Sequence, residues 1–216
     1  MKRLSGFQIG RYFSFTVSTP IMKQKLSNIA KNYLFLDTET TGMIRIGQSS
    51  PRLVEVAWLI CDIEGTILER DEYVIRPDGF TIPRTATSVH GITTDYARRV
   101  GVSLLTALEV LSLSAGNCSV IIGHNVKFDL AIIEGEYKRI GVLDPLAKLS
   151  SVCTMKSTAA FCGMQRMNGY KWPTLLELHL KLFGRPYEHT HRAANDVAAC
   201  ARCFFALKNI GFWDTV

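Results

Sequence analysis

The sequence predicts an α/β fold built on one mixed five-stranded sheet with helices on both faces. Two observations support this prediction. Apolar runs of strand length come first along the chain and are joined by short turns, which is typical of an antiparallel meander. Farther along, segments with helical spacing of apolar residues alternate with short buried runs, which places helices on the faces of the sheet. The chain shows no internal repeat and no low-complexity linker, so one domain accounts for it.

Three apolar runs predict the strands of the meander. The first covers Tyr33–Asp37 and leads into a Thr-rich turn that ends at Gly42. The second covers Leu53–Cys61 and is interrupted only by Glu55. The third, Thr66–Arg76, follows after a short turn, which indicates antiparallel pairing of neighbouring strands.

The remaining elements alternate between helix and strand. Apolar residues at helical spacing predict helices, and short buried runs predict a fourth and a fifth strand. The predicted helices cover Thr94–Arg99, Ser103–Leu113, Lys127–Ile140, Leu175–Leu182 and Ala193–Leu207, and the predicted strands cover Val120–Ile122 and Val152–Thr154.

Length and composition fit a globular domain. The chain has 216 residues, of which 47% are hydrophobic and 20% are charged. An uninterrupted apolar run of about 18 residues would predict a membrane span, and the sequence has none. We therefore expect a protein without a membrane partner.

The positive charge is concentrated at the start of the chain. The formal net charge is +6, and residues 1–31 hold six basic residues and no acidic one. The rest of the chain holds 19 basic and 19 acidic residues and is electroneutral. A basic isoelectric point by itself is therefore weak evidence for a nucleic-acid partner.

Residues 1–31 have three interpretations. They form a basic arm that contacts phosphates, an organelle transit peptide, or a segment that precedes a later start at Met22. We expect a poorly ordered leader without a catalytic role, followed by the functional domain at 32–216. A secretory signal is not expected, because polar residues interrupt any apolar segment of the leader.

The six cysteines do not form a disulfide framework in a chain of this length. Cys200 and Cys203 make a CxxC pair, but they lie within a helical pattern and have no second Cys or His pair nearby. We interpret them as core thiols rather than zinc ligands. Reduced thiols suit a cytoplasmic protein.

The segment Asp37-Thr38-Glu39-Thr40-Thr41-Gly42 carries the strongest chemical signal. Alternate side chains of a strand share a face, so Asp37 and Glu39 project together from the end of a buried strand. Two such carboxylates repel each other and lose hydration, so either one takes a proton or a cation neutralises the pair. Alone, the pattern is also compatible with two acids in solvent at a strand end.

The segment Gly123-His124-Asn125-Val126-Lys127-Phe128-Asp129 follows the fourth predicted strand. Asp129 falls in the first turn of the next helix, where the helix N-terminus attracts an acid. Asn125 precedes that helix and is a candidate N-cap. A catalytic role for Asp129 requires partners from elsewhere in the chain.

The segment His191-Arg192-Ala193-Ala194-Asn195-Asp196 joins a loop to the last predicted helix. The five-residue step from His191 to Asp196 crosses this junction and can place both side chains on one side. Taken alone, an exposed His before a helix has no particular function.

Together and in this order, these segments resemble the DEDDh (DnaQ-like) 3′–5′ exonuclease superfamily, which includes the proofreading subunit of the bacterial replicative DNA polymerase. The resemblance spans roughly residues 33–208 and includes an HGIT segment within Ser88–Thr93. It implies an RNase H-like fold in which four acids converge on a metal site. These acids are Asp37, Glu39, Asp129 and Asp196.

The resemblance also assigns further roles. His191 is the expected general base, and only His191 has the four-residue gap to Asp196 that its competitor His189 lacks. Met43 is expected to pack against the terminal base, and the Thr38 backbone is expected to contact the terminal nucleotide. Asn125 is a further candidate substrate contact.

Two divalent cations, Mg²⁺ or Mn²⁺, are the cofactors that this site implies. Phosphodiester cleavage must activate water and stabilise charge on the attacking and leaving oxygens, which a pair of metal ions about 3.5–4 Å apart does. Hard cations prefer carboxylate oxygens, which suits four acids and no Cys.

Two further features receive a structural interpretation. Glu55 is a lone acid in an apolar strand, and the family pattern has an acid there that does not bind metal. We therefore expect a buried, hydrogen-bonded Glu55. The segment Tyr170-Lys171-Trp172 could stack on bases, but a Trp-Pro step before a helix favours a packing anchor.

We expect hydrolysis of single-stranded DNA 3′ ends, and two alternatives remain open. One is RNA trimming by the same chemistry, and the other is a nucleic-acid-binding module that assists a polymerase. All five chemical positions are filled, which favours an enzyme. Since the chain ends at Val216, soon after the last predicted helix, a stand-alone repair or trimming nuclease is favoured over one bound to a DNA polymerase subunit.

Overall fold

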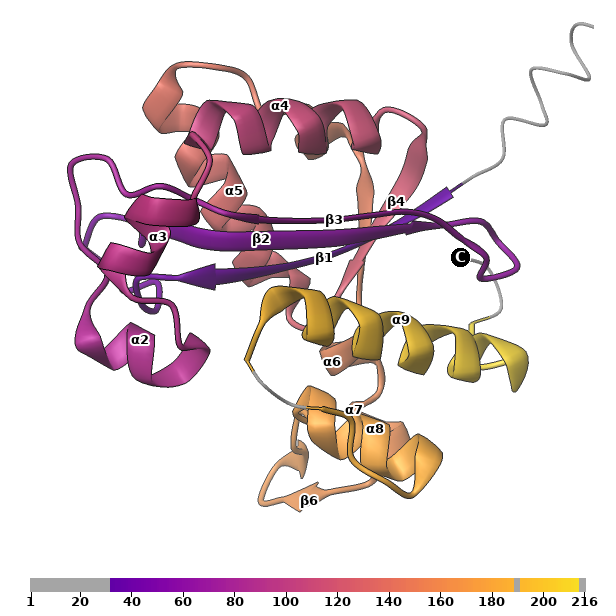
Figure 1. The fold of residues 1–216 in the computed structure, drawn as a ribbon. Coiled ribbons are helices and arrows are strands. Elements are labelled where there is room, and N and C mark those ends of the chain that lie inside the picture. The colour runs from indigo at the N-terminus through magenta and orange to yellow at the C-terminus, as the bar shows by residue number, and fades with distance from the viewer. Residues whose placement is uncertain (1–31, 189–190, 214–216) are drawn as a thin grey trace, which may run out of the picture.

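The computed structural model describes residues 32–188 and 191–213. At its centre lies a five-stranded sheet with the order β3-β2-β1-β4-β5 (Figure 1). β1, β2 and β3 pair antiparallel, whereas β4 is parallel to β1 and β5 is parallel to β4. The predicted mixed five-stranded sheet is therefore confirmed. The strands are β1 Asn32–Thr40, β2 Leu53–Cys61, β3 Ile67–Val74, β4 Cys118–Gly123 and β5 Ser150–Cys153.

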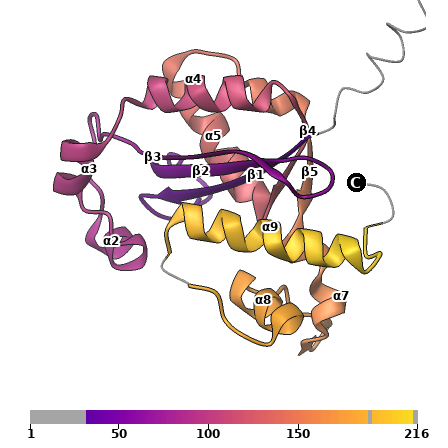
Figure 2. The same cartoon turned by 45° about the vertical axis from the view of Figure 1, so that its right-hand side comes forward.

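Helices cover both faces of the sheet, as predicted. Figures 1 and 2 show α4 and α5 on one face and α9 on the other, with α8 beyond α9. These four helices are α4 Leu104–Ala115, α5 Val126–Ile140, α8 Leu175–Phe183 and α9 Ala193–Asn209. The shorter elements are α2 Arg84–His90, α3 Thr94–Val100, η1 Pro145–Lys148, α6 Thr154–Ser157, α7 Ala159–Cys162 and the ribbon of β6 Gln165–Arg166 and β7 Gly169–Tyr170.

The central strand β1 buries both of its faces, which explains its uninterrupted apolar run. Tyr33 and Phe35 pack with the α9 residue Phe204. Leu34 and Leu36 belong to the opposite cluster, which α4 and α5 cover. The alternation continues along the strand, so Asp37 and Glu39 follow Tyr33 and Phe35 on the face towards α9, and Thr38 faces α5. The strand period thus decides which helix each functional side chain meets.

Two sequence predictions need correction. The first strand does not end at Asp37 but continues to Thr40, because its backbone stays paired with β2 up to Leu53. The segment Ser88–Thr93, which contains the HGIT motif, begins with the last residues of a helix, α2, which the sequence analysis missed. This seven-residue helix has no side-chain N-cap and offers only two buried residues, so its local signal is weak. The predicted leader, residues 1–31, lies outside the described residues.

The two cysteines of the CxxC pair lie in the core, as predicted. Cys200 and Cys203 are buried on α9 beneath the sheet, and both thiols are free. Burial raises the pKa of both thiols, to about 12 for Cys203. Such thiols stay protonated and behave as small apolar groups.

Among the residues that the structure describes, no helix combines the length and the apolar character that a membrane span requires.

A buried acid fastens α5 to the start of β2. The Glu136 carboxylate is fully buried and accepts a hydrogen bond from the Leu53 backbone N–H at 2.9 Å. Arg52 and Arg139 reach it from the rim at 3.0 and 3.1 Å. The pair of arginines neutralises the acid, and the acid satisfies an N–H that would otherwise have no partner at the strand end.

We expect Glu136→Ala to lower the free energy of unfolding by about 3 kcal/mol, because it leaves a buried N–H and two converging arginines without their acceptor. Urea denaturation followed by circular dichroism measures this loss. Glu134→Ala is the matched control on the same helix. Its ion pair with Lys138 is exposed, so its removal costs only about 0.5 kcal/mol or less. Equal effects of the two substitutions would contradict the role of Glu136.

Candidate active site

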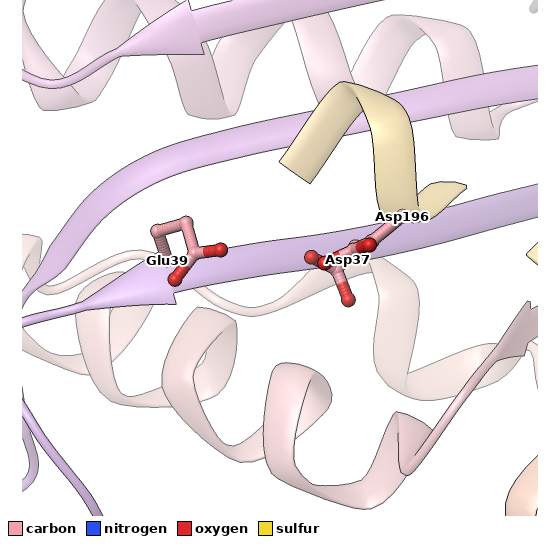
Figure 3. A group of neighbouring side chains, drawn as sticks. All are labelled: Asp37, Glu39 and Asp196. Atoms are coloured by element: carbon pink, nitrogen blue, oxygen red, sulfur yellow. The ribbon is translucent and has the colours of Figure 1, made fainter. Parts of the chain in front are cut away.

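Three carboxylates from two distant parts of the chain meet on the α9 side of the sheet. Asp37 and Glu39 project from the end of β1, and Asp196 projects from the first turn of α9 (Figure 3). One ligand oxygen of each lies within 4.8 Å of the others. A segment near the start of the described chain and one near its end therefore share one acidic cluster, as the family resemblance implies.

The fourth predicted acid, Asp129, lies beside this cluster and faces Thr38. Its Oδ1 accepts hydrogen bonds from the Thr38 backbone N–H at 3.0 Å and from the Thr38 hydroxyl at 2.7 Å. The last residue of β1 that pairs with β4 is Phe35, opposite Ile122. Thr38 lies beyond that pairing, so Asp129 takes the place of a strand partner. The cluster of three within the described chain does not include Asp129, but its charge acts on Asp37.

Burial raises the pKa values of three acids of this site, and the charges of neighbouring acids add to the shift in two of them. Burial, followed by the charge of Asp129 and then that of Asp196, raises the pKa of Asp37 well above its usual value. Burial and the charge of Asp196 raise the pKa of Glu39 to about 8. Burial raises the pKa of Asp129 to about 7, although its hydrogen bonds with Thr38 lower it. A buried group of acids with raised pKa values is the electrostatic setting of a functional site.

The residues present fit a divalent metal ion. The donors of the cluster are carboxylate oxygens, the ligands that Mg²⁺ and Mn²⁺ prefer. Neutralisation by a cation would remove the repulsion that now raises the pKa values of Asp37 and Glu39. The donor set and its electrostatics therefore favour a hard cation over a softer metal.

The Asp196 carboxylate is held by a residue that the sequence analysis missed, Tyr187. The Tyr187 hydroxyl donates a hydrogen bond to Asp196 Oδ1 at 2.6 Å, and Tyr187 is only 7% exposed. Tyr187 lies in the loop between α8 and α9, and nothing in its sequence neighbourhood distinguishes it from an ordinary core tyrosine. Only the folded arrangement brings its hydroxyl to the acid.

Glu55 is buried and hydrogen-bonded, as predicted. It lies directly opposite Glu39 on β2 and is fully buried. Its carboxylate accepts hydrogen bonds from Arg192 Nε at 2.9 Å and from the Ala193 backbone N–H at 2.9 Å. Arg192 Nη2 also donates to Glu72 on β3 at 2.6 Å. The first residues of α9 are thereby fixed to β2 and β3.

His191 immediately precedes this anchored segment. Its side chain is exposed, and its backbone φ of 46° lies in the left-handed region that non-glycine residues rarely adopt. Strained backbone of this kind persists where neighbouring contacts fix it, and the contacts of Arg192 with Glu55 do so here. The competing His189 lies outside the described residues. The role of His191 as general base stays a prediction.

The three expected substrate contacts have different surroundings. Met43 is 68% exposed in the loop after β1, where it is free to meet a ligand. Asn125 occupies the N-cap position of α5, but it has a left-handed backbone and makes no side-chain capping hydrogen bond, so the capping interaction predicted for it is wrong. The Thr38 N–H already donates to Asp129. All three substrate contacts stay predictions.

The packing anchor predicted at Tyr170–Trp172 is wrong. Trp172 is 55% exposed and Tyr170 is 46% exposed. The anchor of this segment is the next residue, Pro173, whose carbonyl accepts a hydrogen bond from His124 Nε2 at 2.9 Å. The indole is therefore left at the surface.

The chain matches the sequence profile of the RNase_T family, described as exonuclease, over residues 34–204. It is 27% identical over 180 residues to the PolC-type DNA polymerase III of Pediococcus pentosaceus, and 26% identical over 178 residues to that of Lacticaseibacillus paracasei. Each match covers 82% of this chain but 11% of the polymerase. The chain thus spans about a tenth of the length of these relatives.

Solved structures of Escherichia coli exonuclease I have the same fold. A complex with a dT13 oligonucleotide superposes with a TM-score of 0.68 at 24% identity, over 82% of this chain and 41% of that one. A zinc-bound complex with single-stranded DNA gives a TM-score of 0.68 at 26% identity, over 85% and 42% of the two chains. This likeness confirms the RNase H-like fold.

The raised pKa values predict that the metal-free protein loses stability as the pH rises. Folding favours the protonated form of an acid whose pKa is higher in the folded state, so that contribution is present at low pH and is lost as the group ionises. For Glu39 the loss extends from about pH 4.5 to about pH 8. Thermal melting in EDTA across this range should show a falling Tm, and added Mg²⁺ or Mn²⁺ should raise the Tm at pH 8.

Glu39→Gln is the control for this pH dependence. The amide cannot ionise, so the variant should lose less of its melting temperature than the wild type between pH 4.5 and pH 8. If the melting temperatures of the two proteins changed with pH in the same way, ionisation of Glu39 would not destabilise the folded protein.

Proposed function

The chain belongs to the RNase_T family of exonucleases, and we propose that it is a 3′–5′ exonuclease that releases nucleoside monophosphates from the ends of single-stranded DNA. The observation that carries this proposal is the half-buried cluster of Asp37, Glu39 and Asp196, whose ligand oxygens lie within 4.8 Å of one another. Without a cation, bringing three carboxylates together costs free energy. A bound divalent cation removes that cost and is also what the hydrolysis of a phosphodiester by activated water requires.

Two divalent cations, Mg²⁺ or Mn²⁺, belong to the proposal. Asp37, Glu39 and Asp196 would hold them together with Asp129, whose second carboxylate oxygen is not engaged by Thr38. When bound, they supply an activated water and stabilise negative charge at the reacting phosphate.

The chain's own residues perform the remaining tasks. His191 accepts the proton of the attacking water, a task that proteins most often give to an imidazole. Tyr187 fixes the orientation of the Asp196 carboxylate through its 2.6 Å hydrogen bond. Thr38 fixes Asp129 in the same way. Met43 meets the terminal base from the exposed loop after β1.

DNA is the favoured substrate because of what the relatives are. The sequence relatives are DNA polymerases, and the exonuclease I structures hold DNA oligonucleotides. The name of the polymerase relatives also gives a partner to test, a polymerase subunit, against action as a stand-alone repair or trimming enzyme in the cytoplasm. Pull-down with a polymerase α subunit separates these two possibilities.

Digestion of matched oligonucleotides tests the activity, its polarity and its metal dependence together. With Mg²⁺ or Mn²⁺, a 5′-labelled single strand should shorten stepwise, a 3′-labelled strand should release its label as a mononucleotide at once, and EDTA should stop both reactions. An RNA strand of the same sequence should be degraded more slowly. Release of a 5′-terminal nucleotide first, or undiminished hydrolysis in EDTA, would overturn the proposal.

Asp196→Ala should abolish this hydrolysis without unfolding the protein. Asp95→Ala is the matched control, because Asp95 is also an acid in the first turn of a helix but lies exposed on α3. The control should keep the activity of the wild type. Thermal melting of both variants checks that the fold is intact.

His191→Ala should lower kcat by about 10²–10⁴-fold, the usual contribution of a general base, and should change the KM for a single strand much less. The comparison with His189→Ala identifies the base, because the two histidines lie two residues apart in the sequence. Wild-type turnover of His191→Ala, with loss in His189→Ala instead, would transfer the role to His189.

A further inference from the structure

Two exposed aromatic side chains stand on the ribbon between α7 and α8. Tyr170 ends β7, and Trp172 follows it two residues later. Alternate residues of an extended segment share a face, so both rings are offered on the same side. Large aromatic side chains normally contribute to cores or to interfaces, and these are 46% and 55% exposed. They are therefore candidates for contact with a ligand.

The part of the sequence that carries these rings is rich in basic residues. Residues 145–176 contain Lys148, Lys156, Arg166 and Lys171 and no Asp or Glu, although residues 32–216 as a whole are electroneutral. Lys156 Nζ lies over the Trp172 ring, 5.0 Å from its centre, in a cation–π contact that leaves the opposite face of the indole for a ligand. Lys171 pairs with Glu177, the first acid after the segment, at 2.5 Å. The aromatic surface is thus bordered by cations that favour an anionic partner.

The ribbon is fastened to the segment that carries Asp129. His124 stands just after β4, five residues before Asp129, and its Nε2 donates to the carbonyl of Pro173 at 2.9 Å. Its Nδ1 lies 3.0 Å from the Thr154 hydroxyl. Burial lowers the pKa of His124, so the ring is neutral and the contact does not depend on a charge. The hydrogen bond between His124 and Pro173, the residue after Trp172, therefore fixes the position of Trp172 relative to the segment of Asp129.

We propose that Tyr170 and Trp172 form a stacking platform for unpaired bases of the strand whose 3′ end is hydrolysed. The proposal rests on the proposed function and adds to it a second contact region away from the acids. Figure 1 shows β6 and α8 on the face of the sheet that α9 covers, which is also the face of Asp37 and Glu39. Lys156 and Arg166 attract the phosphates, and the rings accept any base, because every base has a π face.

A single-stranded ligand fits this surface better than a duplex or a protein partner. Stacking on two side chains of an extended segment requires bases that are not already stacked in a duplex. Lys148, Lys156 and Arg166 suit a polyanion, whereas an ordinary protein interface depletes lysine. The platform would lengthen the site beyond the terminal nucleotide and give longer strands a higher affinity.

The test compares ligands of two lengths with the same protein. In Ca²⁺ without Mg²⁺, Trp172→Ala should weaken binding of an oligothymidine of about 12 nucleotides by about 10-fold, measured by fluorescence anisotropy. Tyr170→Ala should weaken it to a similar or smaller extent, and Trp172→Phe should retain most of the affinity. Lys156→Gln should lower the salt dependence of binding by about 0.7 in the log–log slope.

Hydrolysis of thymidine 5′-p-nitrophenyl phosphate with Mn²⁺ separates this inference from the proposed function. The small substrate carries one nucleotide and no further bases to stack on the platform, so wild type and Trp172→Ala should cleave it equally. Leu143→Ala removes another exposed apolar side chain, 92% exposed in the turn between α5 and η1, and should bind the oligothymidine like the wild type.

Wild-type affinity of both Trp172→Ala and Tyr170→Ala for the oligothymidine would overturn the platform while leaving the nuclease in place. A wild-type protein that cleaves neither the small substrate nor the oligothymidine would instead refute the proposed function. Unchanged melting temperatures of the variants exclude unfolding as the cause of a loss of binding.

Discussion

The crowding of like charges at the half-buried end of β1 is the constraint on which the rest of this structure depends. Desolvation and mutual repulsion raise the pKa values of Asp37 and Glu39, and the charge of Asp196 raises both values further. A fold that keeps such a cluster must supply a precise framework around it, because acids that were free to move apart would do so. The framework consists of the hydrogen bonds of Tyr187 to Asp196 and of Thr38 to Asp129.

The sheet was predictable from the sequence because its signals are local and repeated. Helices cover both faces of β1 and β2, so these strands consist almost entirely of apolar residues in the sequence. Side chains alternate between the two faces of a strand, and this alternation alone places Asp37 and Glu39 on one face. The convergence of these acids with Asp196 was not deducible from spacing. It came from the family resemblance, since no local pattern records that residues so far apart in sequence meet.

The features that the sequence did not predict depend on tertiary contacts. α2 is short and lacks a cap, and the buried His90, whose Nδ1 accepts from the Ile92 N–H, fixes its end only in the folded protein. In the sequence Tyr187 looks like any core tyrosine, and only the folded structure shows that its hydroxyl donates to Asp196. Trp172 was expected in the core because Trp-Pro steps commonly pack, but the contact of Pro173 with His124 fastens the backbone and leaves the ring outside.

The bridge from Arg192 to Glu55 and Glu72 has a consequence for how the protein tolerates change. It joins the start of α9 to two strands that carry none of the four acids, so the geometry of the reaction centre is set partly by residues that never touch the substrate. Strands β2 and β3 thus hold the start of the last helix, α9, in place. A substitution of Glu72 on the outer strand β3 would therefore disturb the position of α9. Although Glu72 is partly exposed, we expect it to vary less among related proteins than other partly exposed residues.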